Sequence, residues 1–440
     1  MTNLLSDPHL YASAALVALT IGLWASARLP EYLTALLFFA AAMMLGLAPP
    51  AVIFSGFSSN AFWLVLSGYV LGLAIRNTGL AARCALALAP HLSASYPRLV
   101  FGVIGMAYGL AFFMPSNMGR IALLMPIVLA LADRVGLAEG RPGRIALALA
   151  VGVGTFQLSA SILPANVPNL VMAGAIESTY QLHLAYQPYL LLHLPVLGVL
   201  KGLALGGCLC LMFRDRLDAR VTVAGDVPSR VPFSSAEKRL MALLLVTLVL
   251  WLTDARHGIA PAWVGLGAAC ICLLPRVGFV SGDEFGRDVN HRTLIYVAAI
   301  LGLAALVGQS GLGRLIGAAL LQWVPLDPGA PMRSFFSIAG ITAALNFVVT
   351  ANGVPAIFTP LAQSLAHACG LPLTAVLMIQ VIGFSTPLLP YQASPIVVAM
   401  AMGKVPQRAA LRLCLALAAI TALVLVPLDY GWFWLLGWLS

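Results

Sequence analysis

Long apolar blocks, interrupted only briefly by polar residues, run through almost the whole chain of 440 residues. Two of them contain Tyr11 to Leu23 and Met241 to Leu252, and about ten approach the ~20 residues that a membrane-spanning helix needs. Hydrophobic residues make up 61% and charged residues 9% of the chain, whereas a soluble domain is about half apolar and about a quarter charged. A chain this apolar cannot cover its surface with polar side chains in water. The sequence therefore excludes a soluble enzyme and predicts an all-α polytopic membrane protein with about 10–12 transmembrane segments.

The formal net charge of the chain is +9. In a membrane protein such an excess reflects the preference of cytoplasmic loops for Lys and Arg, so we expect no nucleic-acid partner. The longest polar stretch, residues 214–239, is rich in Lys, Arg, Pro and Ser, and we interpret it as a cytoplasmic linker. We expect a multi-pass protein of the cytoplasmic (inner) membrane. We expect no cofactor other than a coupling Na⁺, because the cysteines of the apolar helices have no histidine at ligand spacing.

The two halves that flank this linker resemble each other. Three short motifs recur in the same order, at offsets of 232, 234 and 234 residues. Internal repeats of this length in a membrane protein indicate a transporter built from two related halves. The matching motifs are Asn77-Thr78-Gly79-Leu80 with Gln309-Ser310-Gly311-Leu312, Ser116-Asn117-Met118-Gly119 with Thr350-Ala351-Asn352-Gly353, and Gly136-Leu137 with Gly370-Leu371.

The placement of charge predicts that the two halves are inverted. Arg98, Arg134 and Arg141 flank the first of the tip motifs and place the base of that region on the cytoplasmic side. The second region is followed by no Lys or Arg until Lys404, which places its base outside, although Arg333 precedes it. We divide the chain into residues 1–58 (N-terminal scaffold helices), 59–213 (first inverted repeat), 214–239 (linker), 240–290 (connecting transmembrane helices), 291–430 (second inverted repeat) and 431–440 (aromatic C-terminal tail).

Residues 99–132 contain a single charge, Arg120, and are too long for one span. A Pro-Ser-Asn sequence at 115–117 divides them, so we predict a re-entrant helical hairpin whose tip lies at mid-membrane depth. Proline ends the incoming helix. Serine and asparagine cap the outgoing helix, whose free N–H groups and positive dipole end attract an anion. Residues 349–353 carry the same pattern in the second half. The alternative is an ordinary helix–loop–helix with its turn at the surface.

Each hairpin is followed by a second interrupted segment, residues 154–169 in the first half and 383–395 in the second. Paired prolines separated by amides break a helix there and free its backbone carbonyl groups. Such carbonyls, together with side-chain oxygens, are suitable ligands for Na⁺. The alternative is a kinked helix that binds nothing.

These motifs resemble those of a known family. Ser116-Asn117-Met118, followed by Pro126, is similar to the SNT signature of the divalent anion:sodium symporter (DASS) family, within the ion-transporter superfamily. Val167-Pro168-Asn169 resembles the PPN signature of that family, and residues 77–80 resemble its NTGL element. The resemblance covers roughly residues 59–404. It implies a homodimer with a scaffold part and a transport part that moves like an elevator.

The resemblance also implies that substrate and cation bind between the two tips and the two broken helices. Carried over by position and completed with neighbouring tip residues, the substrate-binding residues are Ser116, Asn117, Met118, Gly119, Arg120, Pro168, Asn169, Thr350, Ala351, Asn352, Gly353, Ser394 and Pro395. The cation-binding residues are Ser116, Asn117, Gly154, Asn166, Thr350, Asn352, Gly383 and Gln392.

Three positions differ from the family pattern. Met118 stands where the family has threonine, the second tip reads Thr-Ala-Asn-Gly, and Ile396 stands where a second asparagine is expected. The first tip therefore lacks one oxygen ligand. We hypothesise that the guanidinium of Arg120 supplies fixed positive charge there, takes over part of the role of a sodium ion and contacts an oxyanion with two hydrogen bonds. The alternative is that Arg120 faces the scaffold or the cavity wall.

The sequence predicts a secondary active transporter in the lipid bilayer, a symporter that moves a small anion with Na⁺ or H⁺ by an elevator-type mechanism. Family breadth favours di- or tricarboxylates over sulfate. A cation/proton antiporter or an oxyanion efflux permease is the alternative, although the hairpins and broken helices contain no Asp or Glu before Asp133 and Glu177. A channel is a further alternative to a transporter. An intramembrane enzyme is disfavoured because the chain has no HExxH motif and no defensible nucleophile–base pair.

Overall fold

The computed structural model describes residues 8–26, 28–80, 82–83, 94–217, 232–321 and 326–439. Every regular element within these ranges is a helix, which confirms the predicted all-α class. The centre of the predicted linker, residues 218–231, lies outside the described residues.

The elements that precede the linker form the scaffold helices, the first hairpin and the first broken helix. They are α1 (Pro8–Ser26), α2 (Glu31–Met44), α3 (Pro50–Ile53), α4 (Ser55–Ser58), α5 (Asn60–Thr78), α7 (Tyr96–Ala111), α8 (Asn117–Arg134), α9 (Pro142–Leu158), the 3₁₀ turns η1 (Ser159–Ser161) and η2 (Leu163–Ala165), α10 (Val167–Tyr180), α11 (Tyr186–His193), the π-helical segment η3 (Leu194–Leu200) and α12 (Lys201–Met212).

The elements that follow the linker repeat this order. They are α13 (Ser235–Leu252), α14 (Asp254–His257), α15 (Pro261–Leu273), α16 (Gly282–Asp288), α17 (His291–Gln309), α18 (Leu312–Leu321), α19 (Pro331–Val348), α20 (Val354–Phe358), the 3₁₀ turn η4 (Thr359–Leu361), α21 (Ala362–Cys369), α22 (Leu373–Phe384), the 3₁₀ turn η5 (Pro390–Gln392), α23 (Ser394–Met402), α24 (Gln407–Ile420), the π-helical segment η6 (Thr421–Leu425) and α25 (Val426–Leu435).

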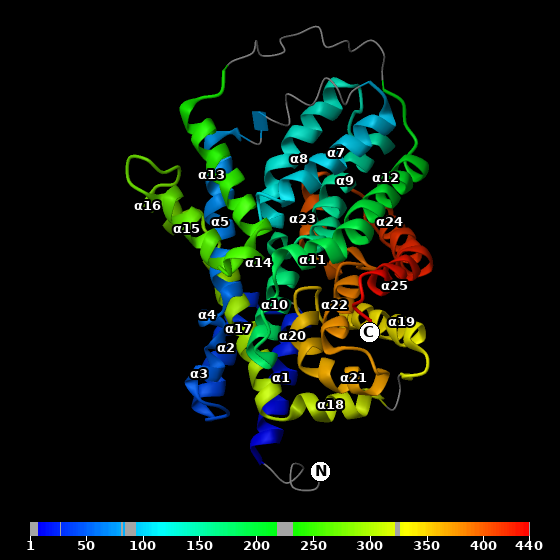
Figure 1. The fold of residues 1–440 in the computed structure, drawn as a ribbon. Coiled ribbons are helices and arrows are strands. Elements are labelled where there is room, and N and C mark those ends of the chain that lie inside the picture. The colour runs from blue at the N-terminus through cyan, green and yellow to red at the C-terminus, as the bar shows by residue number, and fades with distance from the viewer. Residues whose placement is uncertain are drawn as a thin grey trace.

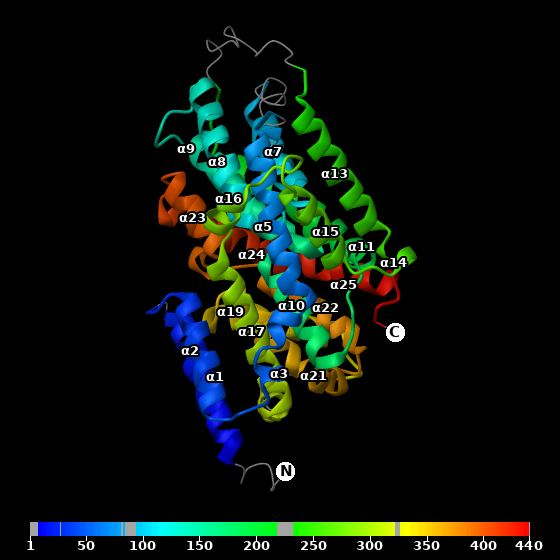
Figure 2. The ribbon, with the colours of Figure 1, turned by 90° about the vertical axis from the view of Figure 1, so that its left-hand side faces the viewer.

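The two hairpins enter the molecule from opposite ends. The first is formed by α7 and α8. Its base lies at the upper end of the molecule in Figure 1, and the ends of α12 and α13 that lead to the linker lie at the same end. The second is formed by α19, α20 and α21 and occupies the lower half (Figures 1 and 2). The arrangement is that of an inverted repeat, with the tips of both hairpins inside the molecule.

The glycines of the repeated motifs have the same backbone conformation in both halves. Gly79 and Gly311 have φ values of 73° and 77°, and Gly136 and Gly370 have values of 78° and 68°. This left-handed region is accessible to glycine at little cost and ends a helix without steric strain. The repeat seen in the sequence therefore preserves turns that only glycine forms easily.

The helix breaks occur where the prolines and amides predict them. In the first half α9 ends at Leu158 and α10 begins at Val167. In the second half α22 ends at Phe384 and α23 begins at Ser394. Both gaps are filled by 3₁₀ turns and extended residues rather than by a continuous kinked helix.

Five of the described helical segments are long and apolar enough to span a membrane uninterrupted, and a sixth results if one strongly bent pair counts as one span. That pair is Val354–Cys369 with Leu373–Phe384, bent by 119°. The predicted number of segments is larger because the hairpin arms and most arms of the broken helices do not qualify; α9, within Pro142–Ser161, is the arm of a broken helix that does so by itself. Interrupted backbone at membrane depth is tolerated where protein buries it or a cavity solvates it.

Helix α17 runs through the centre of the molecule and packs against α2, α3 and α4 on one side and against α10 on the other. Small residues allow the close approach: a Cβ added to Gly302 would lie 2.1 Å from the carbonyl oxygen of Ile53, and one added to Gly174 of α10 would lie 2.8 Å from Leu301. Such small-residue contacts are typical of helix packing in membranes. The first broken helix is thereby held against the scaffold.

Candidate functional site

The two hairpin tips and the first turns of two further helices line one small cavity of about 100 Å³. The first tip contributes Ser116, Asn117 and Met118, and the second contributes Asn352. Six of the thirteen predicted substrate residues lie here, because α23 adds Ser394 and Pro395. The other walls come from α2, α5, α10 and α17 and consist of Glu31, Val65, Gly68, Tyr69, Val167, Leu170, Asn290, Thr293 and Tyr296.

Three helices of the hairpins and broken helices, α8, α10 and α23, begin at this cavity, as do the scaffold helices α2 at Glu31 and α17 at its N-cap Asn290. Ser116 caps α8, since its Oγ accepts a hydrogen bond from the backbone N–H of Gly119 at 3.1 Å. Asn166 caps α10, since its Oδ1 accepts from the backbone N–H of Asn169 at 3.0 Å. Each helix start carries partial positive charge and unpaired N–H groups. Three such ends directed at one cavity create a favourable environment for an anion.

Arg120 lies in the first turn of α8 and is completely buried. Its guanidinium donates hydrogen bonds to the carbonyl oxygens of Met114, Thr155 and Ala165 and to Oδ1 of Asn117. The distances to Thr155 and Ala165 are 3.2 and 3.1 Å. The side chain therefore ties the first tip to both ends of the first helix break. None of these four acceptors is a carboxylate, so they do not neutralise its charge.

This arrangement agrees with one part of the hypothesis for Arg120. The guanidinium lies among carbonyl oxygens of the kind that would otherwise coordinate a cation. The side chain does not line the cavity, however, and its terminal nitrogens are directed at the protein backbone. Direct contact between Arg120 and an oxyanion stays a prediction.

Asn117 connects Arg120 to the cavity. Its Oδ1 accepts hydrogen bonds from the guanidinium and from Oγ of Ser159, the latter at 3.2 Å. Because the oxygen is used inside the protein, the NH₂ group is the end of the amide that is available to the cavity. An NH₂ group donates and cannot accept, which suits an anionic ligand.

The second tip is tied to its own helix break through the backbone. The N–H of Ala351 donates to the carbonyl oxygen of Gln392 at 3.0 Å. Asn346, near the end of α19, donates from Nδ2 to the carbonyl oxygen of Gly383 at 2.9 Å. Each hairpin is thus bonded to the broken helix of the same half, by side chains in the first half and by one backbone and one side-chain donor in the second.

The other predicted substrate residues support the site from behind. Asn169 is buried, and its Nδ2 donates to the carbonyl oxygens of Ala160 and Ile162 at 3.1 and 2.9 Å, which holds the 3₁₀ turns in place. Its Oδ1 has no hydrogen-bond partner. Outside the cavity lining lie Gly119, Arg120, Pro168, Asn169, Thr350, Ala351 and Gly353.

The predicted cation residues that lie in the breaks are engaged with the protein itself. The side chain of Asn166 caps α10, and the carbonyl group of Gly383 accepts from Asn346. Oε1 of Gln392 accepts from the backbone N–H groups of Leu388 and Leu389 at 2.7 and 2.9 Å. Gly154 packs against apolar side chains of α12 and α7. The structure does not gather these four residues around one common point.

The sequence analysis overlooked two buried charged residues beside the second break. Lys201 and Asp429 are both completely buried. Nζ of Lys201 donates to the carbonyl oxygen of Ser385 and to Oγ1 of Thr386, each at 2.9 Å. The signal was present, because Lys201 is the one Lys, Arg, Asp or Glu in an apolar span of 27 residues and Asp429 is the one acidic residue in an apolar span of 29.

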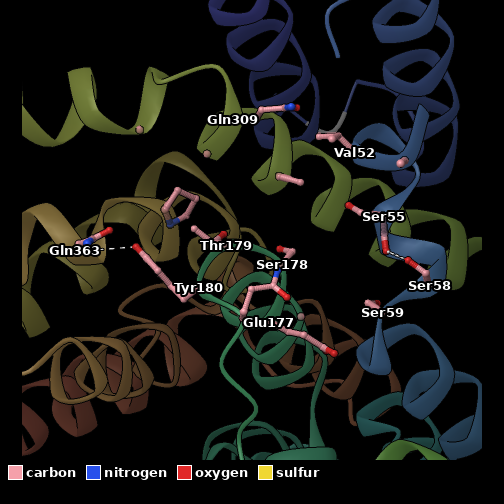
Figure 3. A pocket seen from close by; sticks show the side chains of 17 residues that line it. Val52, Ser55, Ser58, Ser59, Glu177, Ser178, Thr179, Tyr180, Gln309 and Gln363 are labelled. Atoms are coloured by element: carbon pink, nitrogen blue, oxygen red, sulfur yellow. Dashed lines mark hydrogen bonds between the residues drawn. The ribbon is translucent and has the colours of Figure 1, made fainter. Parts of the chain in front are cut away.

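A larger cavity of about 750 Å³ lies at the other end of α17 (Figure 3). Ser55 and Ser58 line its scaffold side, whereas Glu177 and Tyr180 line the side of the first broken helix. Nδ2 of Asn60 donates to Oε1 of Glu177 at 2.9 Å and links the two sides. The small cavity adjoins the first turns of α17 and the large one its last turn.

Comparison with known proteins identifies the family of this chain. The family model described as the sodium:sulfate symporter transmembrane region matches residues 2–439. The chain belongs to this family. Members are membrane transporters of anions, so the protein is an anion transporter and not an enzyme.

Two relatives illustrate the range of the family. An L-tartrate/succinate antiporter of Escherichia coli is 25% identical over 399 residues, which cover 86% of this chain and 79% of the antiporter. A protein of Cupriavidus necator described as a membrane protein is 22% identical over 341 residues, which cover 75% of this chain and 66% of that protein.

Two solved structures share the fold. The YdaH transporter of Alcanivorax borkumensis superimposes with a TM-score of 0.55 at 16% identity, and 88% of each chain is covered. MtrF of Neisseria gonorrhoeae, from a class of antimetabolite efflux pumps, gives a TM-score of 0.54 at 14% identity, with 87% of this chain and 83% of that chain covered. The polytopic membrane fold expected from the sequence is confirmed.

Proposed function

We propose that this transporter carries small dicarboxylates of the succinate and tartrate type across the cytoplasmic membrane. The observation that carries the proposal is the convergence of three helix N-termini and both hairpin tips on one cavity of about 100 Å³. The size favours a small anion, since sites for drug-sized ligands measure roughly 300–1,000 Å³. The antiporter relative that handles L-tartrate and succinate supports the same class of substrate.

The proposed site has two half-sites with different roles. In the first, Ser116 and Asn117 donate to one carboxylate of the substrate. In the second, Asn352 and the start of α23 at Ser394 receive the other carboxylate. Arg120 donates a hydrogen bond to Asn117 and carries an uncompensated positive charge. This charge stabilises the bound dianion electrostatically. A single oxyanion such as sulfate does not need two separated half-sites, which favours the dicarboxylate.

We further propose that no sodium ion binds in the first half-site and that transport does not depend on one there. A sodium ion there would need carbonyl and amide oxygens from the tip and the break. The oxygens of Met114, Asn117, Thr155 and Ala165 already accept hydrogen bonds from Arg120. A permanently charged guanidinium gives the site positive charge without an exchangeable cation.

We further propose an elevator movement along α17. The scaffold comprises residues 1–58 and 240–290 together with α5 and α17, and the moving part comprises both hairpins and both broken helices. The two cavities at opposite ends of α17 give the moving part room to slide. A homodimer whose contacts are made by the scaffold would keep that part fixed in the membrane.

The test is counterflow in proteoliposomes that contain the purified full-length protein. Vesicles loaded with unlabelled succinate, L-tartrate, citrate or sulfate are diluted into labelled succinate, with and without sodium. We expect rapid counterflow with internal succinate or tartrate, little with sulfate, and the same rate in sodium-free buffer. Counterflow by sulfate alone would refute the dicarboxylate assignment, and an absolute need for sodium would refute the role given to Arg120.

A further inference from the structure

Lys201 and Asp429 occupy nearly equivalent places in the two halves. They are 228 positions apart, close to the 227 positions that separate Pro168 from Pro395 in the two broken helices. Lys201 directly follows the π-helical segment η3, and Asp429 lies in the first turn after the π-helical segment η6. Such π-helical irregularities occur frequently at functional sites.

The ammonium group of Lys201 sits at the second helix break. Besides its two bonds of 2.9 Å, Nζ lies 3.3 Å from Oγ of Ser385. Ser385 is the C-cap of α22, where the helix dipole presents its negative end. Across the same break α23 begins, and its residues Ser394 and Pro395 line the small cavity. The charge of Lys201 therefore acts on the broken helix that receives the substrate.

Asp429 is a buried carboxylate without a hydrogen-bond donor. Neither of its oxygen atoms has a partner among the described residues, and the side chain has no exposed surface. An ionised carboxylate in such surroundings is costly unless a positive charge compensates it. The segments η3 and η6, which directly precede α12 with Lys201 and α25 with Asp429, pack against each other, so Lys201 is the positive charge placed to compensate it. A proton bound to Asp429 would remove the cost in another way.

One further titratable group lies deep in this region. His193 is completely buried at the end of α11, and neither ring nitrogen has a hydrogen-bond partner. Its ring lies 6.1 Å from that of Phe433, one turn beyond Asp429, and 4.6 Å from that of Tyr189. The other titratable groups on α11, α12, α19, α24 and α25 are Tyr186, Tyr189, Cys208, Cys210, Arg333, Arg408, Arg412, Cys414 and Tyr430.

We propose that Lys201 and Asp429 form a proton-binding site that couples anion transport to pH. With Asp429 ionised, the pair is neutral. When Asp429 takes up a proton from water, its carboxyl group becomes neutral and the positive charge of Lys201 is no longer cancelled. The second half-site then attracts a dianion more strongly. By thermodynamic reciprocity the bound dianion increases the proton affinity of Asp429 by the same factor, so proton and anion move together.

This inference rests on the proposed dicarboxylate function and adds the coupling ion. Arg120 supplies a constant charge to the first half-site, whereas the charge of the second half-site changes with the protonation of Asp429. The absence of Asp and Glu from the hairpins and broken helices before Asp133 and Glu177 disfavoured proton coupling in the sequence. Asp429 provides the carboxylate that proton coupling needs. The carboxylate that carries the proton is supplied by α25, outside the hairpins and the broken helices.

The experiment uses the purified full-length protein in proteoliposomes with the membrane potential clamped. Counterflow of labelled succinate is measured first. Net uptake is then measured with and without a proton gradient directed inward. We expect the gradient to increase uptake by the wild type about fivefold or more, the lower limit of typical coupling between two sites. Asp429→Asn, which resembles the protonated state, should still exchange succinate at a rate that no longer responds to pH.

Controls separate this site from other titratable groups. Asp283→Asn removes an exposed carboxylate of α16 and should respond to the gradient like the wild type. His193→Gln should also keep the response. The double variant Lys201→Met/Asp429→Asn removes both buried charges, which protects the test if the single variant does not fold, and its uptake should be insensitive to pH.

Two outcomes would overturn the inference: a wild-type response that survives in Asp429→Asn or in the double variant, and a wild type that exchanges succinate but ignores the proton gradient. Absence of succinate counterflow in the wild type would instead refute the proposed substrate. The two proposals therefore fail by different measurements. All variants are compared at the same pH values, so protonation of succinate itself affects them equally.

Discussion

The guanidinium of Arg120 donates to the carbonyl oxygen of Ala165 across 3.1 Å, although 45 residues separate them along the chain. Arg120 belongs to a hairpin that starts at one end of the molecule, and Ala165 lies in the break of the next helix. Their hydrogen bond makes the first tip and the first break a single unit. The first half-site therefore moves as one rigid body, as an elevator movement requires.

Replacement of Arg120 by lysine should reduce both transport and the stability of the folded protein. Lysine keeps the charge, but a single ammonium group cannot reach the four acceptors that the planar guanidinium serves. Hydrogen bonds that involve a charged group contribute about 1.5–3 kcal/mol each. We expect the apparent affinity for succinate to fall at least about tenfold, which corresponds to the loss of one such bond. Counterflow measured over a range of succinate concentrations checks this.

Arg120→Met removes the charge as well, and we expect it to abolish succinate binding. Arg76→Lys is the matched control, because Arg76 is largely exposed and pairs with Asp288 at the surface. That variant should transport normally. Wild-type kinetics in Arg120→Met, with unchanged indifference to sodium, would show that Arg120 has only a packing role.

Asn117→Asp provides a test of charge that preserves shape. The new carboxylate would accept the same hydrogen bond from Arg120 and neutralise it, so the folded protein should be at least as stable as the wild type. The positive charge of Arg120 would be cancelled and the NH₂ donor of residue 117 would be lost together. We expect strong loss of succinate transport with an unchanged or higher melting temperature of the purified protein.

Asn117→Ala should behave differently from Asn117→Asp. It leaves part of the buried guanidinium without an acceptor, at a cost of about 1–3 kcal/mol in stability. We expect both lower transport and a lower melting temperature. Asn352→Ala should lose transport while its melting temperature stays near that of the wild type, because Asn352 lines the cavity and supports no buried charge. If Asn117→Asp transports normally, the charge of Arg120 is irrelevant to the substrate.

Local chemistry explains which features the sequence reveals. Proline, glycine and the capping amides act on their own neighbours, so the breaks after Leu158 and Phe384 and the caps at Ser116 and Asn166 could be predicted directly. The repeat predicted two halves with the same local fold, and the placement of Lys and Arg predicted that these halves are inverted. These features need no knowledge of distant contacts.

Contacts between distant segments could not be predicted in this way. Lys201 reaches Ser385 across 184 residues, and no local pattern links them. For a similar reason the sequence does not show that the carbonyl group of Gly383, a predicted cation ligand, accepts a hydrogen bond from Asn346, 37 residues away. Isolated charges in apolar spans were the available clue, and they indicate where a charge is needed without indicating its partner.

The inverted arrangement predicts that the two hairpin bases face opposite sides of the membrane. Ala138 follows the first hairpin and His367 lies near the end of the second, and both are exposed. In a background without native cysteines, a membrane-impermeant thiol reagent should label Ala138→Cys only from the cytoplasm and His367→Cys only from outside. Labelling of both positions from one side of intact cells would contradict the inverted repeat.

The large cavity at the end of α17 gives a test of the elevator movement. Ser55 of α4 lines its scaffold side, opposite Glu177 and Tyr180 of the first broken helix. If the moving part enters this space, a large group attached there must block it, whereas a small one fits within about 750 Å³. We expect Ser55→Cys to transport succinate normally and to lose at least about tenfold in rate after labelling with a bulky maleimide, equivalent to a barrier about 1.4 kcal/mol higher. Methylation of the same thiol should have little effect.

Met332→Cys, exposed at the start of α19 and outside the cavity lining, is the matched control and should tolerate both reagents. Equal rates for the bulky and the small label at position 55 would mean that the broken helix does not move into this cavity.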